Sequence, residues 1–213
     1  PDDPTDDEQG NADINGVEQL HLGAELDMTY DITDKLRLLG MISAADWGYA
    51  GNPSGVAFDQ NADAIGSITL DLDDKKVGDA AQFTARIGLD LDITDNFSLD
   101  YSQRFIDRLY ARLNADDFTI DPVTGDVNAD GSLQLPGYSV ADLGATYRFT
   151  FNNDTKLSLR LNINNLWAAE YIVESATNIT ANSGDPTYLG VNMDNKVFFG
   201  WGTTWNFTVR YQF

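Results

Sequence analysis

A short acidic motif in the middle of the chain is the stretch whose residues best suit metal binding. Asp126, Asn128 and Asp130 stand at alternate positions before Gly131, which matches the first half of an EF-hand calcium loop. Their carboxylate and amide oxygens are ligands that Ca²⁺ prefers. The bidentate acid that should complete the loop falls on Gly137. Asp126, Asn128 and Asp130 are therefore candidate calcium ligands, and a plain Asx–Gly turn is the competing interpretation.

Arginines recur within several apolar stretches, always on the polar parity. Because side chains alternate between the two faces of a strand, these arginines would share the face opposite the apolar residues. There they could pair with acids across the strands or on another domain, or contact a ligand directly. The predicted polar-face residues are Arg86, Arg104, Arg108, Asp142, Arg148, Arg160 and Arg210, with Glu25, Asp27, Asp90 and Asp100 as further acidic partners.

Other chemistry finds little support in the sequence. The single histidine, His21, has no spaced acids near it, and the chain contains no cysteine, which excludes disulfides and Cys-based metal or nucleophile sites. No catalytic triad, P-loop or paired carboxylates in a rigid cleft can be recognised. We expect a protein that is not an enzyme and has no cofactor, the candidate calcium apart.

Long strands with two unlike faces must position these residues. From Val197 to Phe213 one parity is almost wholly apolar and the other almost wholly polar or glycine. This alternation indicates a strand, and its length exceeds the about 9–11 residues that cross a bilayer. The stretch from Leu36 to Trp47 is less regular, because Leu39 and Met41 interrupt its polar parity. With the clearer stretches that begin near 16, 82, 97, 142 and 157, the sequence predicts seven membrane-crossing strands in an all-β chain.

The predicted connections alternate between short and long. Outer-membrane barrels place short turns in the periplasm and long loops outside the cell. We therefore assign periplasmic turns near 31–34, 92–95 and 152–155, and extracellular loops near 48–80, 111–137 and 168–195.

The direction of the last strand then sets the organisation of the rest. Strand directions alternate backward from this last strand, so we expect residues 1–15 to form an acidic extracellular loop and residues 16–213 to form the barrel part. Seven is an odd number of strands, and an open sheet would leave unpaired edges in lipid. We expect this chain to supply the C-terminal part of a larger antiparallel barrel, with the polar-face residues toward its lumen.

The charge of the chain narrows the class of partner. With 34 acidic and 13 basic residues the net charge is −21. A surface this acidic argues against nucleic-acid binding. It suits solubility or loose association with divalent cations.

Four short motifs resemble one family when they are taken in order. They are Lys76–Thr84, Leu135–Phe149, Leu161–Trp167 together with Glu170–Ile172, and Arg210–Phe213. Together they resemble the C-terminal barrel region of TonB-dependent outer-membrane receptors, and the first is closest in style to receptors of the Bacteroidetes.

This resemblance implies a 22-stranded barrel with a plugged lumen, in the bacterial outer membrane. Its function would be the energised uptake of a metal chelate, vitamin, glycan or peptide. The implied partners are membrane lipid, an N-terminal plug with the remaining strands, the TonB complex and a surface lipoprotein. Tyr211 and Phe213 would form the aromatic C-terminal signal that the barrel-assembly machinery reads.

Two other functions compete with receptor-mediated uptake. One is a structural or porin-like outer-membrane barrel without TonB coupling. The other is a soluble calcium-binding β-sandwich used in adhesion, which the length of the apolar faces disfavours.

Overall fold

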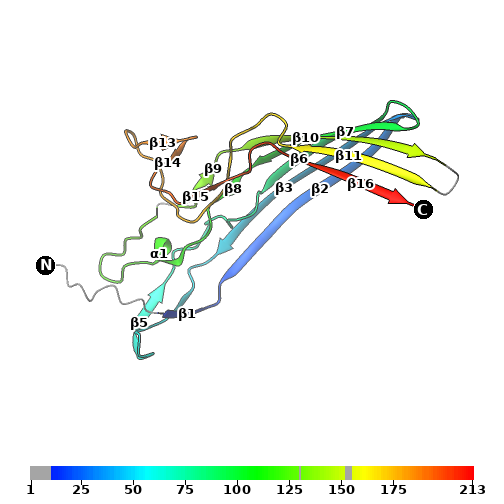
Figure 1. The fold of residues 1–213 in the computed structure, drawn as a ribbon. Helices are drawn as coiled ribbons and strands as arrows, with labels where there is room; N and C mark the ends of the chain where they lie inside the picture. The colour runs from blue at the N-terminus through cyan, green and yellow to red at the C-terminus, as the bar shows by residue number, and fades with distance from the viewer. Residues whose placement is uncertain (1–10, 130, 152–154) are drawn as a thin grey trace.

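The computed structural model describes residues 11–129, 131–151 and 155–213, and its main feature is one antiparallel sheet of seven strands (Figure 1). These strands lie side by side in the order in which they follow along the chain. The sheet is open, and β2 and β16 are its two edges. This confirms the all-β fold and the seven long strands. The strands are β2 (Glu18–Thr33), β3 (Leu36–Ala50), β6 (Phe83–Asp92), β7 (Phe97–Asp107), β10 (Tyr138–Thr150), β11 (Lys156–Asn164) and β16 (Thr204–Gln212).

The register of the strands separates an apolar face from a polar face. One row of paired residues on the apolar face joins Leu26, Ile42, Ala85 and Phe105 across β2, β3, β6 and β7. Leu26 is 66% exposed in this row. A soluble monomer rarely exposes an apolar surface this wide, whereas a sheet in contact with lipid requires one.

Short turns join the strands at one end of the sheet. Asp34 and Lys35 connect β2 to β3. Between β6 and β7 the hydroxyl oxygen of Thr94 accepts hydrogen bonds from the amides of Asn96 (3.3 Å) and Phe97 (3.0 Å), which closes the turn. Most of the third expected turn, 152–154, lies outside the described residues.

The long connections at the other end form small sheets of their own (Figure 1). The segment expected to be an extracellular loop, 1–15, includes β1, which pairs with β4; residues 1–10 lie outside the described part. The additional elements are β1 (Asn11–Asn15), β4 (Ser54–Phe58), β5 (Ala64–Thr69), β8 (Leu109–Tyr110), α1 (Ala115–Phe118), β9 (Gln134–Leu135), β12 (Ile172–Ser175), β13 (Thr187–Tyr188), β14 (Val191–Asn192) and β15 (Val197–Phe199). Within the described residues, no helix is long and apolar enough to cross a membrane.

The buried apolar clusters lie at this loop end and not along the middle of the sheet. One cluster consists of Leu70, Leu72, Phe118 and Ala129. A second consists of Leu109, Leu135, Ile172 and Val191. Burying side chains of this size stabilises a structure by about 1.5–3 kcal/mol each. The loops are therefore packed against one another, while the apolar face of the sheet has no protein layer over it among the described residues.

The predicted final strand is shorter than its alternation indicated. The pattern is continuous from Val197, but β15 ends at Phe199 and β16 begins only at Thr204. At the break, the amide of Gly200 donates to the carbonyl of Tyr171 (2.9 Å). A Cβ at Gly200 would lie 2.0 Å from the Tyr171 ring, so the glycine lets the ring cover the backbone there. The expectation of one unbroken strand from Val197 to Phe213 was wrong, because β15 pairs with β12 whereas β16 pairs with β11.

Alternate positions of β16 should report unlike surroundings. Phe207 lies on the apolar face opposite Leu161, and Thr208 lies on the polar face opposite Arg160. We expect a spin label at position 207 of the membrane-inserted protein to contact lipid, and one at 208 to contact water. Electron paramagnetic resonance with an apolar and a polar relaxation agent measures this difference. Equal accessibility at the two positions would contradict the assignment of the faces.

Candidate functional site

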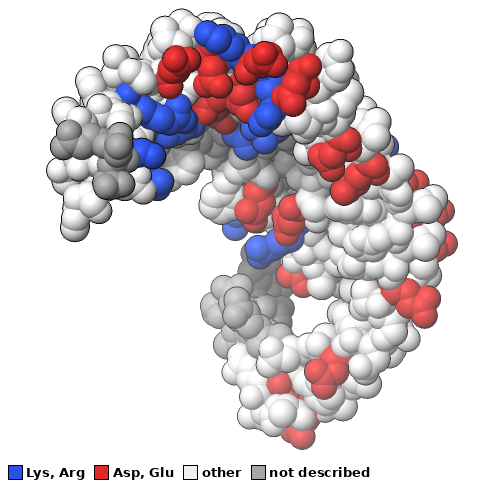
Figure 2. Space-filling view, turned by 90° about the vertical axis from the view of Figure 1, so that its right-hand side faces the viewer, with Lys and Arg blue, Asp and Glu red and all other residues white. Residues whose placement is uncertain are grey.

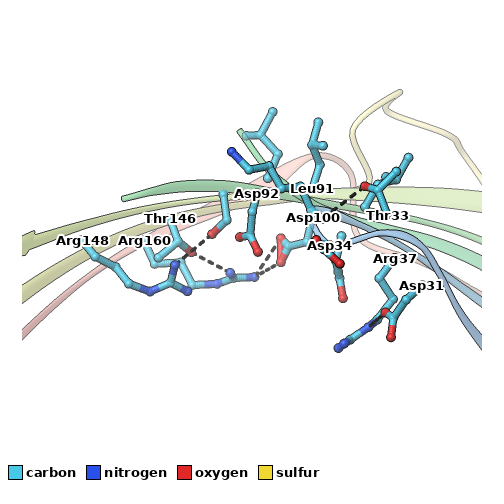
Figure 3. A pocket seen from close by; sticks show the side chains of 15 residues that line it. Asp31, Thr33, Asp34, Arg37, Leu91, Asp92, Asp100, Thr146, Arg148 and Arg160 are labelled. Atoms are coloured by element: carbon cyan, nitrogen blue, oxygen red, sulfur yellow. Dashed lines mark hydrogen bonds and ion pairs between the residues drawn. The ribbon is translucent and has the colours of Figure 1, made fainter. Parts of the chain in front are cut away.

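The polar face of the sheet carries two neighbouring hollows. The first has a volume of about 310 Å³ and lies near the short turns (Figure 3). The second, of about 280 Å³, lies next to it and shares Asp90, Asp100 and Arg160 with the first. Figure 2 looks onto the end with the short turns and shows the molecule as an open arc with acidic and basic side chains close together. The polar face thus carries acidic and basic side chains close to one another.

A row of paired charges crosses the first hollow. Asp31, Arg37, Asp90 and Asp100 stand opposite one another on β2, β3, β6 and β7. The Nε of Arg37 lies 2.6 Å from the Oδ1 of Asp31. Like charges that face each other directly across strands are destabilising, as Asp90 and Asp100 do here. Arg37 beside Asp90 therefore offsets part of that repulsion.

Arg160 offsets the rest by reaching across a whole strand. Asp100 is on β7 and Arg160 on β11, with β10 between them. The Nη2 of Arg160 lies 2.5 Å from the Oδ1 of Asp100, and its Nη1 donates to the Thr146 hydroxyl oxygen (2.9 Å). Gly144 of β10 stands opposite Asp100. A Cβ there would lie 1.7 Å from the Oδ2 of Asp100 and 2.6 Å from the Nη2 of Arg160. Because Gly144 has no side chain, the ion pair between Asp100 and Arg160 can cross β10 at this position.

A second ion pair lies toward the loop end. The Nη2 of Arg104 is 3.0 Å from the Oδ2 of Asp142. The other oxygen of Asp142 accepts a hydrogen bond from the backbone amide of Asn165 (3.0 Å). Through these two contacts Asp142 connects the sheet to the segment that follows β11. Both partners are partly exposed, so the pair contributes at most about 1 kcal/mol by itself.

The remaining predicted arginines occupy different surroundings. Arg148 donates to the Ser98 hydroxyl oxygen (3.3 Å). Arg148 and Arg210 flank Ser158 from β10 and β16. Arg86 lies on the polar face directly opposite Arg104. Five of the predicted arginines and Asp142 therefore share one face, and whether that face borders a lumen stays a prediction.

Arg108 does not share the polar face with the other five arginines, because β7 ends one residue before it. β7 ends at Asp107, and Arg108 has a positive φ of 50°, which breaks the alternation of side chains. Its guanidinium lies 5.9 Å from the centre of the Phe83 ring. Phe83 and Ala85 lie on the apolar face of β6, whereas Arg86 lies on its polar face. The sequence alternation therefore placed Arg108 on a face that the structure does not give it.

The calcium motif lies in a loop that is already ordered by another acid. The Oδ1 of Asp121 accepts hydrogen bonds from the amides of Val123 (2.7 Å) and Thr124 (3.1 Å). These two hydrogen bonds hold the pKa of the Asp121 carboxyl below its usual value. The side-chain Nδ2 of Asn128 donates to the backbone carbonyl oxygen of Asp116 (3.1 Å), and Asp130 lies outside the described residues.

Calcium binding by Asp126, Asn128 and Asp130 therefore stays a prediction. Across the described residues no group of three or more His, Asp or Glu side chains is placed to hold a metal ion. His21 stacks on Trp47 with ring centres 5.2 Å apart, and its ring forms a hydrogen bond with the side chain of Gln19.

Sequence reasoning did not find Gly144, Arg37 and Asp31. Arg37 and Asp31 lie beside the first short turn, where the irregular strand at 36–47 obscured the parity. Gly144 lies on the polar parity of its strand, but nothing in the sequence marks it out. The role of Gly144 depends on which residues of β7 and β11 stand opposite it. The sequence of a single strand does not determine that register.

Comparison with known families gives one match. The family described as "TonB dependent receptor-like, beta-barrel" matches residues 2–166, which is more than half of the chain. No curated protein sequence matches.

Three solved structures are similar to the chain. The closed form of the ferric-catecholate import receptor Fiu from E. coli K12 has 16% identity and a TM-score of 0.43, covering 92% of this chain and 28% of that one. The open form of Fiu has 16% identity and a TM-score of 0.39, with 95% and 28% covered. The copper transporter OprC has 16% identity and a TM-score of 0.39, with 92% and 31% covered. The chain thus spans less than a third of the length of these proteins.

Adding a methyl group at Gly144 should break the ion pair that crosses β10. We expect Gly144→Ala to lower the free energy of unfolding of the detergent-solubilised protein by about 1 kcal/mol, because the Cβ displaces the Asp100 carboxylate from Arg160 and this partly exposed ion pair is lost. Urea titration in detergent measures this. Gly66→Ala is the matched control, since Gly66 is also in a strand and has open space around it; its effect should stay within about 0.5 kcal/mol.

A second background isolates the carboxylate. In Asp100→Ala protein the new methyl group has no carboxylate to meet, so Gly144→Ala should cost less there than in the unaltered protein. Equal losses in the two backgrounds would show that Gly144 has some other role.

Proposed function

This chain belongs to the TonB-dependent receptor-like β-barrel family, and from that premise we propose that it forms one wall of an outer-membrane receptor for energised nutrient uptake. The observation that carries the proposal is the seven-stranded sheet with one exposed apolar face and one charged face. A wall between lipid and an aqueous lumen needs these two faces on opposite sides of the same strands.

The open edges support a larger barrel, and the resemblance to the receptor family implies about 22 strands in it. Every residue of β2 and of β16 is exposed, and each strand has one neighbour in the sheet. An unpaired backbone group in hydrocarbon costs several kcal/mol. We propose that strands of the rest of the receptor pair with both edges, that a plug fills the lumen, and that the plug couples to the TonB complex.

The orientation follows from the two unlike ends. The packed loop layer would face outward, where it meets cargo and a surface lipoprotein, and the short turns would face the periplasm. The cargo would be a metal chelate, vitamin, glycan or peptide. A calcium ion held by Asp126, Asn128 and Asp130 would tie one of these loops.

A porin-like barrel without TonB coupling is the second candidate, because the same two-faced wall would serve it. The soluble adhesion sandwich is disfavoured: in the described structure no second sheet covers the apolar face of the first. A transport assay separates the first two candidates.

Loss of the receptor and loss of TonB should have the same consequence if uptake is energised. We expect deletion of the complete receptor gene, and separately of tonB, to abolish depletion of one nutrient class from the medium. Liquid chromatography with mass spectrometry of spent medium, supplied with ferric chelates, cobalamin, glycans and peptides, measures this. Depletion that needs the receptor gene but continues without tonB would favour the porin-like barrel.

The last residue is expected to act during assembly more than in the folded wall. Phe213 follows β16 and is 96% exposed, so removing it deletes little packing. We expect deletion of Phe213 to lower the amount of receptor inserted in the membrane several-fold, with the melting temperature of the inserted fraction within about 1–2 °C of the unaltered value. Quantitative immunoblotting of outer membranes measures the amount, and Tyr211→Ala tests the second residue of the signal. Unchanged insertion would leave Phe213 as a simple interfacial aromatic.

A further inference from the structure

Two basic side chains lie on the apolar face of the sheet, at its loop end. Arg108 is partly buried, and its guanidinium lies 5.9 Å from the centre of the Phe83 ring. Lys76 pairs with Gly48, which stands opposite Leu20 on the apolar face. A charge on the lipid-facing side of a barrel is costly at the middle of the bilayer and much less costly near the interface. The two basic residues therefore lie where this face would meet the lipid head groups.

The backbone around Gln82 brings these two cations together. The Nη2 of Arg108 donates to the carbonyl oxygen of Gln82 (3.1 Å), which also accepts a hydrogen bond from the amide of Ala45 (2.7 Å). The next residue, Asp46, has its Oδ1 2.6 Å from the Nζ of Lys76. In the described part of the chain each cation forms one side-chain hydrogen bond. An ammonium has three donors and a guanidinium five, so most of their donors are left for a ligand.

Two carboxylates balance the charge of this cluster. Asp46 pairs with Lys76, and the Oδ1 of Asp107 accepts a hydrogen bond from the backbone amide of Arg108 (2.7 Å). The cluster is therefore neutral, and it would recognise a ligand by short hydrogen bonds more than by long-range attraction. A phosphate group suits these donors, because arginine binds its oxygens in pairs and lysine binds them as a point charge.

An apolar hollow lies on the same face, nearer the middle of the sheet. It has a volume of about 310 Å³ and is formed by β2, β3, β6 and β7. Gly40 and Ala85 have the smallest side chains in its lining, which leaves space between larger neighbours such as Met28 and Phe105. Phe83 precedes Ala85 by two residues on the same face of β6. The hollow therefore lies next to the aromatic ring that Arg108 covers.

We propose that this part of the apolar face binds one phosphate-bearing lipid of the bilayer, with its phosphate at Lys76 and Arg108 and an acyl chain in the hollow. A hollow with an apolar lining on a lipid-facing surface favours hydrocarbon, and donors at its loop-side end favour the phosphate of the same molecule. In the proposed orientation this lipid belongs to the outer leaflet. The inference rests on the membrane location of the sheet and not on the uptake of a cargo.

Native mass spectrometry of the complete receptor in detergent, with added dioleoylphosphatidylglycerol, tests the head-group contact. We expect the double variant Arg108→Gln, Lys76→Gln to bind this lipid about tenfold more weakly, the effect of losing charge-assisted hydrogen bonds. Dioleoylglycerol, which has the same chains and no phosphate, should bind the unaltered receptor more weakly by a similar factor. Lys156→Gln is the control, because Lys156 stands opposite Gln212 on the polar face, and lipid binding should not change.

A variant that fills the hollow tests the acyl chain separately. A Cβ at Gly40 would lie 3.5 Å from the Cε of Met28, which is an ordinary contact, so Gly40→Leu should fold and occupy the space. We expect it to weaken binding of dioleoylphosphatidylglycerol while Lys76 and Arg108 are intact.

The two sets of variants must act on the same lipid. Unchanged binding in either the head-group variant or the hollow variant overturns the inference, as does equal binding of dioleoylglycerol, while the uptake proposal stands. If spin labels at 207 and 208 instead report equal surroundings, the sheet does not border lipid, and the inference and the proposed function fail together.

Discussion

A backbone amide or carbonyl in hydrocarbon must have a hydrogen-bond partner, and the rest of this structure follows from that requirement. Antiparallel strands satisfy it along their length, and the same pairing puts alternate side chains on opposite faces. In this chain one face is apolar and exposed and the other is charged. The two edge strands, β2 and β16, each have one neighbouring strand, so the backbone groups on their outer sides are not paired within the described sheet.

Stability is divided between the loop end and the surroundings of the sheet. The two buried clusters pack connections from distant parts of the chain against one another, so the loops form a compact layer over one end of the wall. The middle of the sheet has no such core among the described residues. Its apolar face depends on lipid for burial, which is consistent with membership of an outer-membrane barrel family.

The charged face is organised by contacts that pass between non-neighbouring strands. Arg160 reaches Asp100 because Gly144 leaves room on the strand between them. Arg37 and Arg160 together compensate the opposed aspartates, and Asp142 compensates Arg104. Glycine and arginine thus act together here: the first makes the gap, and the second is long enough to cross it.

The sequence alone determined the seven strands, their two faces and their short turns, because alternation and turn residues are local properties. It also carried the family resemblance. Only the tertiary structure decided which residues stand opposite one another, and therefore the role of Gly144. It likewise decided that the last strand is interrupted between Phe199 and Thr204 and that Arg108 leaves the charged face. These features depend on register and on contacts between distant segments, which the period of a single strand does not encode.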